Sequence, residues 1–430
     1  MANTVSKSKL VSTIAEASDV FKFCAKKTKI LASLSWDPKV AAEFLAAKGT
    51  VIPKPTYNVD RTSGEKAMEQ LKALEPKLKG DDPALIWLRR THQSYCNGVR
   101  LLGELENKTF HEVSSALYGN PKSIPYEGGK SNLALASALL SRLETVSIND
   151  ITEKQASISS EEFAEKLALK LKARTPEIPV RVEITDDIVA KVVAGMNRVR
   201  IRRDARFAVM DLDALWNHEI ESHCLTAHNG AHHNGCDFLT SGGPRTTMTQ
   251  EGLAVFHEIY GHTMSQHRFW SLCHRIQAID KVEAGADFIE LYRWYRDRCE
   301  SDSEAFYATQ RVFRGAPLTG GAPFTKDVVY LGGLLGIYNF LRIAVKTQNH
   351  LLIESLVCGR IALEDVTTIA WLRSHGILNP PKFVPKWLEN WEALLSFFSF
   401  SAYLNHIDLS AFQNYFDSQN IFQSWDYSLY

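Results

Sequence analysis

The residues with the clearest chemical potential are two histidines and a glutamate in the segment WNHEIESHC. His218 and His223 are five positions apart, and Glu219 directly follows the first histidine. Neutral imidazoles bind zinc at ~2 Å. On an ideal α-helix, positions i and i+5 point roughly 140° apart, so both histidines reach one ion only if a π-bulge adds a residue to that turn. The spacing therefore predicts a π-turn at a metal site.

A third candidate ligand lies in the next helical segment, TMTQEGLA. A short loop and a returning helix would bring the carboxylate of Glu251 to the two histidines. Three protein ligands leave the fourth position of a tetrahedral zinc ion open for water, as in catalytic zinc sites. Glu219 would face that water and act as the general base. The alternative is a structural histidine pair on a buried helix, with Glu251 in a salt bridge.

The same pattern occurs a second time further along the chain. His257 and His262 form another H-E-x-x-x-H pair, and Glu290 follows it as a possible third ligand. Periodicity does not choose between the two sets. His257 has another possible role, as a donor to Glu251 or to bound substrate. A third group of histidines fits a polar loop better than a ligand set: His228, His232 and His233.

The elements that must position these residues are mostly helical. Apolar spacing predicts helices over residues 1–50, 64–120, 133–174 and 211–308, from residue 328, and after Pro381. Alternation predicts strands at VRVEIT and at RVRIRR from Arg198, with a short helix, DDIVAKVVAGM, between them. The expected class is α+β, mostly helical, with a zinc-metallopeptidase-like core and a short strand element beside the HExxxH helix. The segment RVRIR is either an edge strand that pairs with a peptide or a plain structural strand.

Domain boundaries follow from the prolines. Pro53 and Pro55 end a first helical segment, because proline removes a backbone donor and disfavours helix before it. We expect an N-terminal helical segment at 1–55, a catalytic unit at 56–380, and a C-terminal helical tail at 381–430 packed on the core. Large apolar residues near both ends are expected in the core: Leu31, Leu34, Trp36, Phe397, Phe398, Phe400 and Tyr403.

Composition excludes several classes of protein. Lys plus Arg and Asp plus Glu number 49 each, so no global field steers the chain to nucleic acid or to a membrane. No secretory leader and no uncharged apolar stretch of spanning length is apparent. Seven cysteines without a CxxC pair are typical of free thiols in a reducing compartment. We expect a cytoplasmic protein without a membrane span.

These motifs together resemble the QEGLA-motif family, which includes the microtubule-associated tyrosine carboxypeptidases. The chain reads TQEGLA from Thr249, preceded by HEIESH, Asn229-Gly230 and the approach RIRRDARFAVMDLDALWNHEI. Further similarity lies in SWDPKVAAEFL with Pro53, SSALYGNP, RVFRGAP and GGAPFTKDVVYLGGL. The resemblance covers about residues 31–380. The HEIYGH repeat departs from the family pattern and leaves the roles of His257 and His262 open.

The resemblance implies one zinc ion per chain, bound by His218, His223 and Glu251, with Glu219 as base. It also implies a carboxypeptidase, which needs a cation for the terminal carboxylate of its substrate. Candidate substrate-binding residues lie in the two downstream stretches: Arg311, Arg314, Lys326 and Tyr330, the last as a donor to the oxyanion. For each of these, a salt bridge or loop anchor is the alternative. Gly315, Gly320 and Gly321 would let this loop approach a peptide closely.

The implied substrate is a protein tail, with removal of a C-terminal tyrosine from tubulin or another protein. Arginines near the strand element are candidates to read an acidic tail, although a solvent-facing strand explains them equally well: Arg198, Arg200, Arg202, Arg203 and Arg206. Two other functions stay open. One is a catalytically silent zinc-binding regulatory protein, and the other is a zinc endopeptidase.

Overall fold

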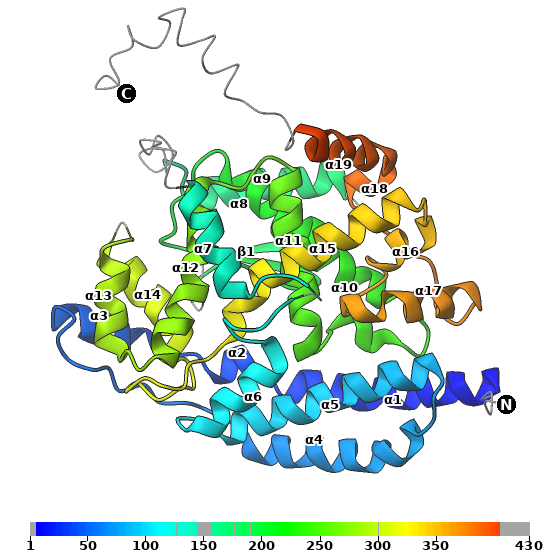
Figure 1. The fold of residues 1–430 in the computed structure, drawn as a ribbon, viewed down its shortest axis with the longest axis horizontal. Helices are drawn as coiled ribbons and strands as arrows, with labels where there is room; N and C mark the ends of the chain where they lie inside the picture. Colours follow the sequence, from blue (N-terminus) through cyan, green and yellow to red (C-terminus); the bar gives the residue numbers. More distant parts are fainter. Residues whose placement is uncertain are drawn as a thin grey trace, which may run out of the picture.

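The fold is given by a computed structural model that describes residues 6–125, 128–143, 157–175, 177–186, 188, 191–299 and 301–404. It is mostly helical with one small sheet (Figure 1), so the predicted α+β class is confirmed. The last predicted helical segment is present up to residue 404, and its continuation to 430 lies outside the described residues. The predicted domain boundaries stay predictions.

The helices within residues 7–33 and 61–118 form a layer along one side of the molecule, whereas those at 132–143 and 160–174 lie outside this layer (Figure 1). Asp, Asn and Ser side chains cap several helices, for example Asp82 at the start of α5 and Asn107 at the start of α6. The helices are α1 (Lys7–Lys27), α2 (Ile30–Ser33), α3 (Pro38–Ala46), α4 (Arg61–Leu74), α5 (Pro83–Gly103), α6 (Lys108–Tyr118), α7 (Asn132–Leu143) and α8 (Ser160–Arg174), with the 3-10 turn η1 (Glu75–Leu78).

The sheet consists of β1 (Arg181–Thr185), β2 (Val192–Ala194) and β3 (Arg198–Arg202), in the order β1-β3-β2. One prediction is wrong here, and of the two alternatives for RVRIR the plain structural strand is the one present. The segment expected as a short helix contains β2, because its valines suit a strand and pair antiparallel with β3 across a tight turn. The RVRIR strand is central rather than at an edge, because β1 pairs with its other side.

The sheet packs on the helix that bears the first histidine pair. Val199 and Ile201 of β3 point inward into a small core, where Phe163 stacks on Phe207 at 4.0 Å between ring centroids. Trp216 and Ile220 belong to the same small core. The sheet therefore fixes the back of the candidate metal helix.

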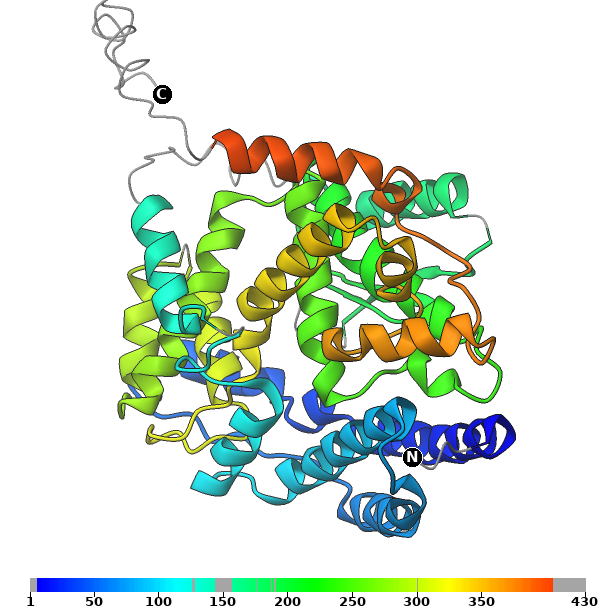
Figure 2. The same cartoon turned by 45° about the vertical axis from the view of Figure 1, so that its right-hand side comes forward.

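The second half of the chain surrounds two helices that cross at the centre, α11 (Thr247–Tyr260) and α15 (Val329–Lys346) (Figure 2). Around them lie α9 (Asp211–Leu215), η3 (Trp216–Cys224), α10 (Leu225–Gly230), η4 (Asp237–Thr240), η5 (Pro244–Thr246), α12 (Gln266–Glu283), α13 (Phe288–Arg296), α14 (Asp302–Phe313), η6 (Lys326–Val328), α16 (His350–Ser355), η7 (Leu363–Asp365), α17 (Val366–Ser374), α18 (Lys386–Glu389) and α19 (Glu392–Leu404). Among the described residues, one stretch, Lys326–Lys346, is long and apolar enough to cross a membrane, and 61% of its apolar 18-residue window is buried inside the fold.

The expectation that all large apolar residues near the ends are core is wrong in part. Leu34, Trp36 and Phe398 are buried, and Phe397 packs against the core. Leu31, Phe400 and Tyr403 are 40%, 64% and 67% exposed. Leu31 lies on the solvent side of the short helix α2, and Phe400 and Tyr403 lie on that of α19, a distinction that composition alone does not make.

Candidate metal centre

The predicted π-turn is present. Trp216–Cys224 forms the π-helix η3, continuous with α9 before it and α10 after it. With hydrogen bonds from i to i+5, His218 and His223 project from the same face, and their ring centroids are 5.1 Å apart at an interplanar angle of 80°. The i, i+5 spacing is therefore matched by the local backbone.

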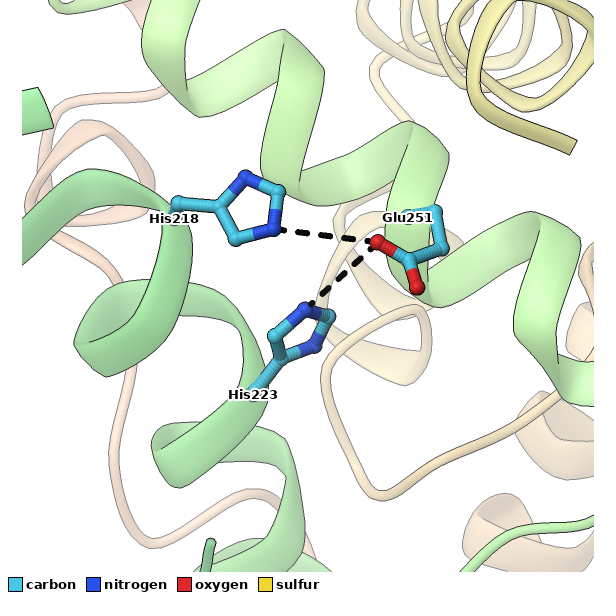
Figure 3. A group of neighbouring side chains, drawn as sticks. All are labelled: His218, His223 and Glu251. Atoms are coloured by element: carbon cyan, nitrogen blue, oxygen red, sulfur yellow. Dashed lines mark ion pairs between the residues drawn. The ribbon is translucent and has the colours of Figure 1, made fainter. Parts of the chain in front are cut away.

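Glu251 reaches the two histidines from the second turn of α11 (Figure 3). Its Oε2 atom lies 3.7 Å from His218 Nε2 and 3.9 Å from His223 Nε2. One possible ligand atom from each residue lies within 4.8 Å of the others. A tetrahedral ion at ~2.1 Å from its ligands holds them roughly 3.4 Å apart, so these residues fit a zinc ion after a small contraction.

The charges of the three residues differ in a way that suits metal binding. Burial lowers the pKa of His223 to about 3, so its imidazole is neutral. Burial also opposes protonation of His218, but hydrogen bonds to Glu251 and Glu258 outweigh it and raise its pKa to about 10. Burial disfavours ionised Glu251 too, yet Lys326 and His218 hold its pKa well below the usual range. A cation entering the site would replace one proton on His218.

The second H-E-x-x-x-H pair does not converge. His257 is buried, with its Nδ1 2.7 Å from Ser222 Oγ, and its Nε2 accepts a hydrogen bond of 2.7 Å from Trp387 Nε1. His262 follows the end of α11 with φ 55°, and Glu290 is bound in the capping box of α13. Within the described part of the chain, His257 therefore forms no hydrogen bond or ion pair with Glu251 or with the two candidate ligand histidines, and it supports η3 from behind through Ser222.

The glutamate of that second pair has a role that sequence reasoning missed. Glu258 Oε1 lies 2.6 Å from His218 Nδ1, and Arg268 donates to both Glu258 oxygens at 3.3 Å. Arg268 and His218 hold the pKa of Glu258 at about 2 against the effect of burial. A carboxylate on the far nitrogen of a ligand histidine fixes the tautomer and ring orientation. The available signal in the sequence was the spacing: Glu258 lies seven residues after Glu251, which places both on the same side of a helix.

Glu219 lies beside this centre and contacts β2. Burial raises the pKa of its carboxyl, and the positive charge of His218 opposes that effect. The backbone amide of Ala194 hydrogen-bonds to the carboxylate. A carboxylate with a raised pKa near a metal-bound water is suited to accept a proton at neutral pH.

Three of the four predicted substrate-binding residues form a connected group that begins at Glu251. Lys326 Nζ is 3.1 Å from Glu251 Oε1 and 3.4 Å from the Tyr330 hydroxyl. Arg311 donates to both Asp327 oxygens, at 2.6 and 2.8 Å, and lies 3.4 Å from the Tyr330 hydroxyl. The hydroxyl of Tyr330 is therefore flanked by two cations, and its pKa is lowered although burial opposes the shift.

Other predicted residues have structural roles. Gly315 packs against Phe110, and Gly320 packs against the backbone of Gly285 and Ala286, so these two glycines serve packing rather than approach to a peptide. The imidazole nitrogens of two loop histidines contact backbone carbonyls, His228 that of Met196 and His233 that of Cys358. Sequence reasoning also missed three arginines near the site. Arg268 donates to Glu258, Arg275 lies over the Tyr330 ring, and Arg360 donates to the backbone carbonyl of His223.

Fold and site together define a mostly helical protein with a candidate metal centre on a π-helix. The chain matches the family described as microtubule-associated tyrosine carboxypeptidase over residues 42–406, and it belongs to that family. The predicted resemblance is confirmed. The family supports, in general terms, a peptidase of the tyrosine carboxypeptidase kind that acts on a protein.

Two further comparisons add little. No curated protein matches the chain. A crystal structure of a "putative lipoprotein" from Colwellia psychrerythraea is similar at 11% sequence identity, covering 90% of this chain and 77% of that chain with a TM-score of 0.42. A similarity at this level supports no argument about function.

Proposed function

We propose that the protein is a zinc-dependent carboxypeptidase that binds one zinc ion per chain and removes the C-terminal residue of a protein tail. The observation that supports this most strongly is the convergence of His218, His223 and Glu251 on one point, with Glu219 next to it on the same π-helix. Family membership supports the reaction class. When bound, zinc supplies a water of lowered pKa and polarises the scissile carbonyl.

The residues of the chain have separate tasks in this proposal. Glu219 accepts the proton of the attacking water and later gives it to the leaving amine, while the amide of Ala194 keeps its carboxylate in place. Glu258 holds the His218 ring. The Tyr330 hydroxyl donates to the oxyanion of the tetrahedral intermediate, strengthened by the adjacent charges of Lys326 and Arg311.

The strand β2 is suited to align the peptide, in the role first considered for RVRIR. Residues 191 and 195 hydrogen-bond to β3, as does the paired Val193. Alternation in an antiparallel ladder turns the backbone groups of Val192 and Ala194 to the opposite side, where Ala194 already contacts Glu219. An extended peptide pairing with β2 would place its last bond beside the base.

For the substrate, we propose a tail that ends in tyrosine, with tubulin as the first candidate and the cytoplasm as the location. The exposed face of the sheet presents several arginines, of which Arg198, Arg202 and Arg203 pair with nearby acidic residues. The carboxylates of an acidic tail would compete with these acidic residues for the arginines. Each exposed ion pair contributes little stability by itself and is therefore easily exchanged.

Elemental analysis combined with peptide hydrolysis tests this proposal. We expect one zinc per chain in the wild type, loss of zinc in His223→Ala, and retention in His262→Ala. Glu219→Gln should retain zinc and lose hydrolysis of a peptide ending in tyrosine. A peptide with an amidated terminus should resist the wild type, whereas an endopeptidase would cleave it. Full activity of Glu219→Gln, or zinc lost only in His262→Ala, would exclude the proposed centre.

A further inference from the structure

Four cationic side chains lie over the Tyr330 ring, Arg268, Arg275, Arg311 and Lys326. A fifth, Arg314, interacts electrostatically with the tyrosine, and three of the five have carboxylate partners. Arg268 pairs with Glu258, Lys326 pairs with Glu251, and Arg311 donates both of its hydrogen bonds to Asp327. Asp327 is 4% exposed, so the Arg311 pair anchors the start of α15 from inside the protein. Two of the residues first predicted to bind substrate, Arg311 and Lys326, are thus already engaged by acidic groups.

The remaining two cations have no hydrogen-bond acceptor among the residues that the structure describes. Arg275 is 14% exposed, and its Nε is 3.9 Å from Asp327 Oδ2, too far for a hydrogen bond. The Nε atom of Arg314 is buried without a partner, and so is the hydroxyl of Tyr295, which interacts electrostatically with Arg275. Burying unpaired charge is costly, so these groups point to an anion that completes the cluster.

The titration of the four arginines agrees with this division. Burial lowers the pKa of Arg275, and burial together with Arg311 lowers that of Arg314 to about 10. The arginines that have carboxylate partners, Arg268 and Arg311, have raised pKa values in spite of burial. The positive charges of Arg275 and Arg314 are therefore not fully balanced by nearby carboxylates until an anion binds.

We propose that Arg275 and Arg314 bind the C-terminal carboxylate of the peptide, with the Tyr295 hydroxyl as a further donor. The proposal deepens the proposed function and rests on it. The Arg275 guanidinium lies 5.0 Å from the centroid of the Tyr330 ring. Lys326 contacts both the Tyr330 hydroxyl and Glu251, and so connects this ring to the candidate metal centre. In a peptide, the terminal carboxylate is one residue from the last peptide bond, and one extended residue spans at most roughly 3.6 Å. Carboxylate bound here leaves that bond on the metal side of Tyr330.

Such a site explains why the enzyme would act at chain ends. A planar guanidinium binds a carboxylate through two parallel hydrogen bonds, and an amide or a continuing chain brings no negative charge to the two arginines. Such a chain would leave both largely buried guanidinium groups without a hydrogen-bonded carboxylate. Specificity would thus depend on a charge that only a free C-terminus supplies.

The test measures binding without turnover, in the Glu219→Gln protein, by calorimetry with acetyl-Glu-Tyr and with its C-terminal amide. We expect the acid to bind more tightly than the amide. Arg275→Gln and Arg314→Gln should each weaken binding of the acid about tenfold to hundredfold, the range for a charge-assisted hydrogen bond, and leave the amide unchanged. Arg275→Lys, which keeps the charge but loses the planar fork, should fall in between.

Two controls separate binding from folding. Arg293→Gln changes an exposed arginine on α13 and should leave both affinities unchanged. In thermal melts without peptide, Arg275→Gln and Arg314→Gln should equal or exceed the parent, because they remove an uncompensated charge, whereas Arg311→Gln should melt lower. If Arg275→Gln and Arg314→Gln melted at a temperature as low as that of Arg311→Gln, the two arginines would have a structural role and the proposal would be overturned.

Further outcomes of the binding experiment test the carboxylate site separately from the proposed hydrolysis. Unchanged binding of the acid in both variants, or equal loss for acid and amide, would overturn the proposal. If the wild type hydrolyses no peptide but still prefers the acid through these arginines, the proposed hydrolysis fails and the carboxylate site stands.

Discussion

Replacing Glu258 with glutamine should weaken zinc binding although Glu258 is not itself a ligand. Its Oε1 atom lies 2.6 Å from His218 Nδ1, so the carboxylate holds the ring with its other nitrogen toward Glu251. Glutamine has nearly the same size and keeps an oxygen that accepts this hydrogen bond. The change therefore removes charge and little else, apart from leaving Arg268 without its carboxylate partner.

The expected magnitude follows from the type of hydrogen bond. A bond to a charged group contributes about 1.5–3 kcal/mol and a neutral one about 0.5–1.5 kcal/mol, so the loss is about 1–1.5 kcal/mol, or roughly tenfold in affinity. Loss of ring orientation adds to this, and mutation of such outer partners typically costs about 10–100-fold in metal affinity or activity. We expect the zinc dissociation constant to rise within that range.

The assay is competition for zinc against a chromophoric chelator, with circular dichroism to check the fold. Arg268→Gln is the matched control, because it removes the partner of Glu258 but keeps the hydrogen bond between Glu258 and His218. It should weaken zinc binding less than Glu258→Gln. A Glu258→Gln protein that is folded and binds zinc within twofold of the wild type would refute the assigned role.

Three further predictions follow. Arg311→Gln should lower the free energy of unfolding by about 2–4 kcal/mol in urea titrations, because it leaves Asp327 buried without its main partner; an unchanged midpoint would contradict this pairing. Zinc affinity should fall about tenfold per pH unit below about pH 10, because the raised pKa of His218, about 10, means that a proton must leave before the metal binds. Calorimetry in buffers of different ionisation enthalpy should detect about one released proton, and none would contradict it. His257→Gln should keep zinc but lower thermal stability, because it disrupts the contacts with Ser222 and Trp387; loss of zinc together with a wild-type melting temperature would contradict this.

Much of the site could be predicted from sequence, because its signals are local. The i, i+5 spacing of His218 and His223 demanded a π-turn, and one is present. Helical periodicity also placed Glu251 on a separate helix. In contrast, the helical appearance of the segment around Val192 was overridden by pairing with β3, since strand pairing depends on residues outside the segment.

Charge pairing was the part that sequence could not resolve. Arg311 and Arg275 are the same residue type on neighbouring helices, and only the position of Asp327 distinguishes the bidentate partner from the arginine at 3.9 Å. Glu258 was likewise hidden, because its motif resembled a second metal site. The ring it supports belongs to a different helix, 40 positions earlier in the chain.

The glycine after the third candidate ligand shows how the fold brings these groups together. A Cβ atom on Gly252 would lie 2.2 Å from the carbonyl carbon of Gly333, and one on Gly333 would lie 2.1 Å from the Met248 carbonyl oxygen. The backbones of α11 and α15 are therefore in direct contact. Each glycine costs a helix about 1 kcal/mol relative to alanine, a cost that this close packing offsets. With larger residues the helices would separate, and Lys326, just before α15, would no longer reach Glu251 at 3.1 Å. The small residue beside the candidate ligand thus determines the distance between the metal centre and its cationic neighbours.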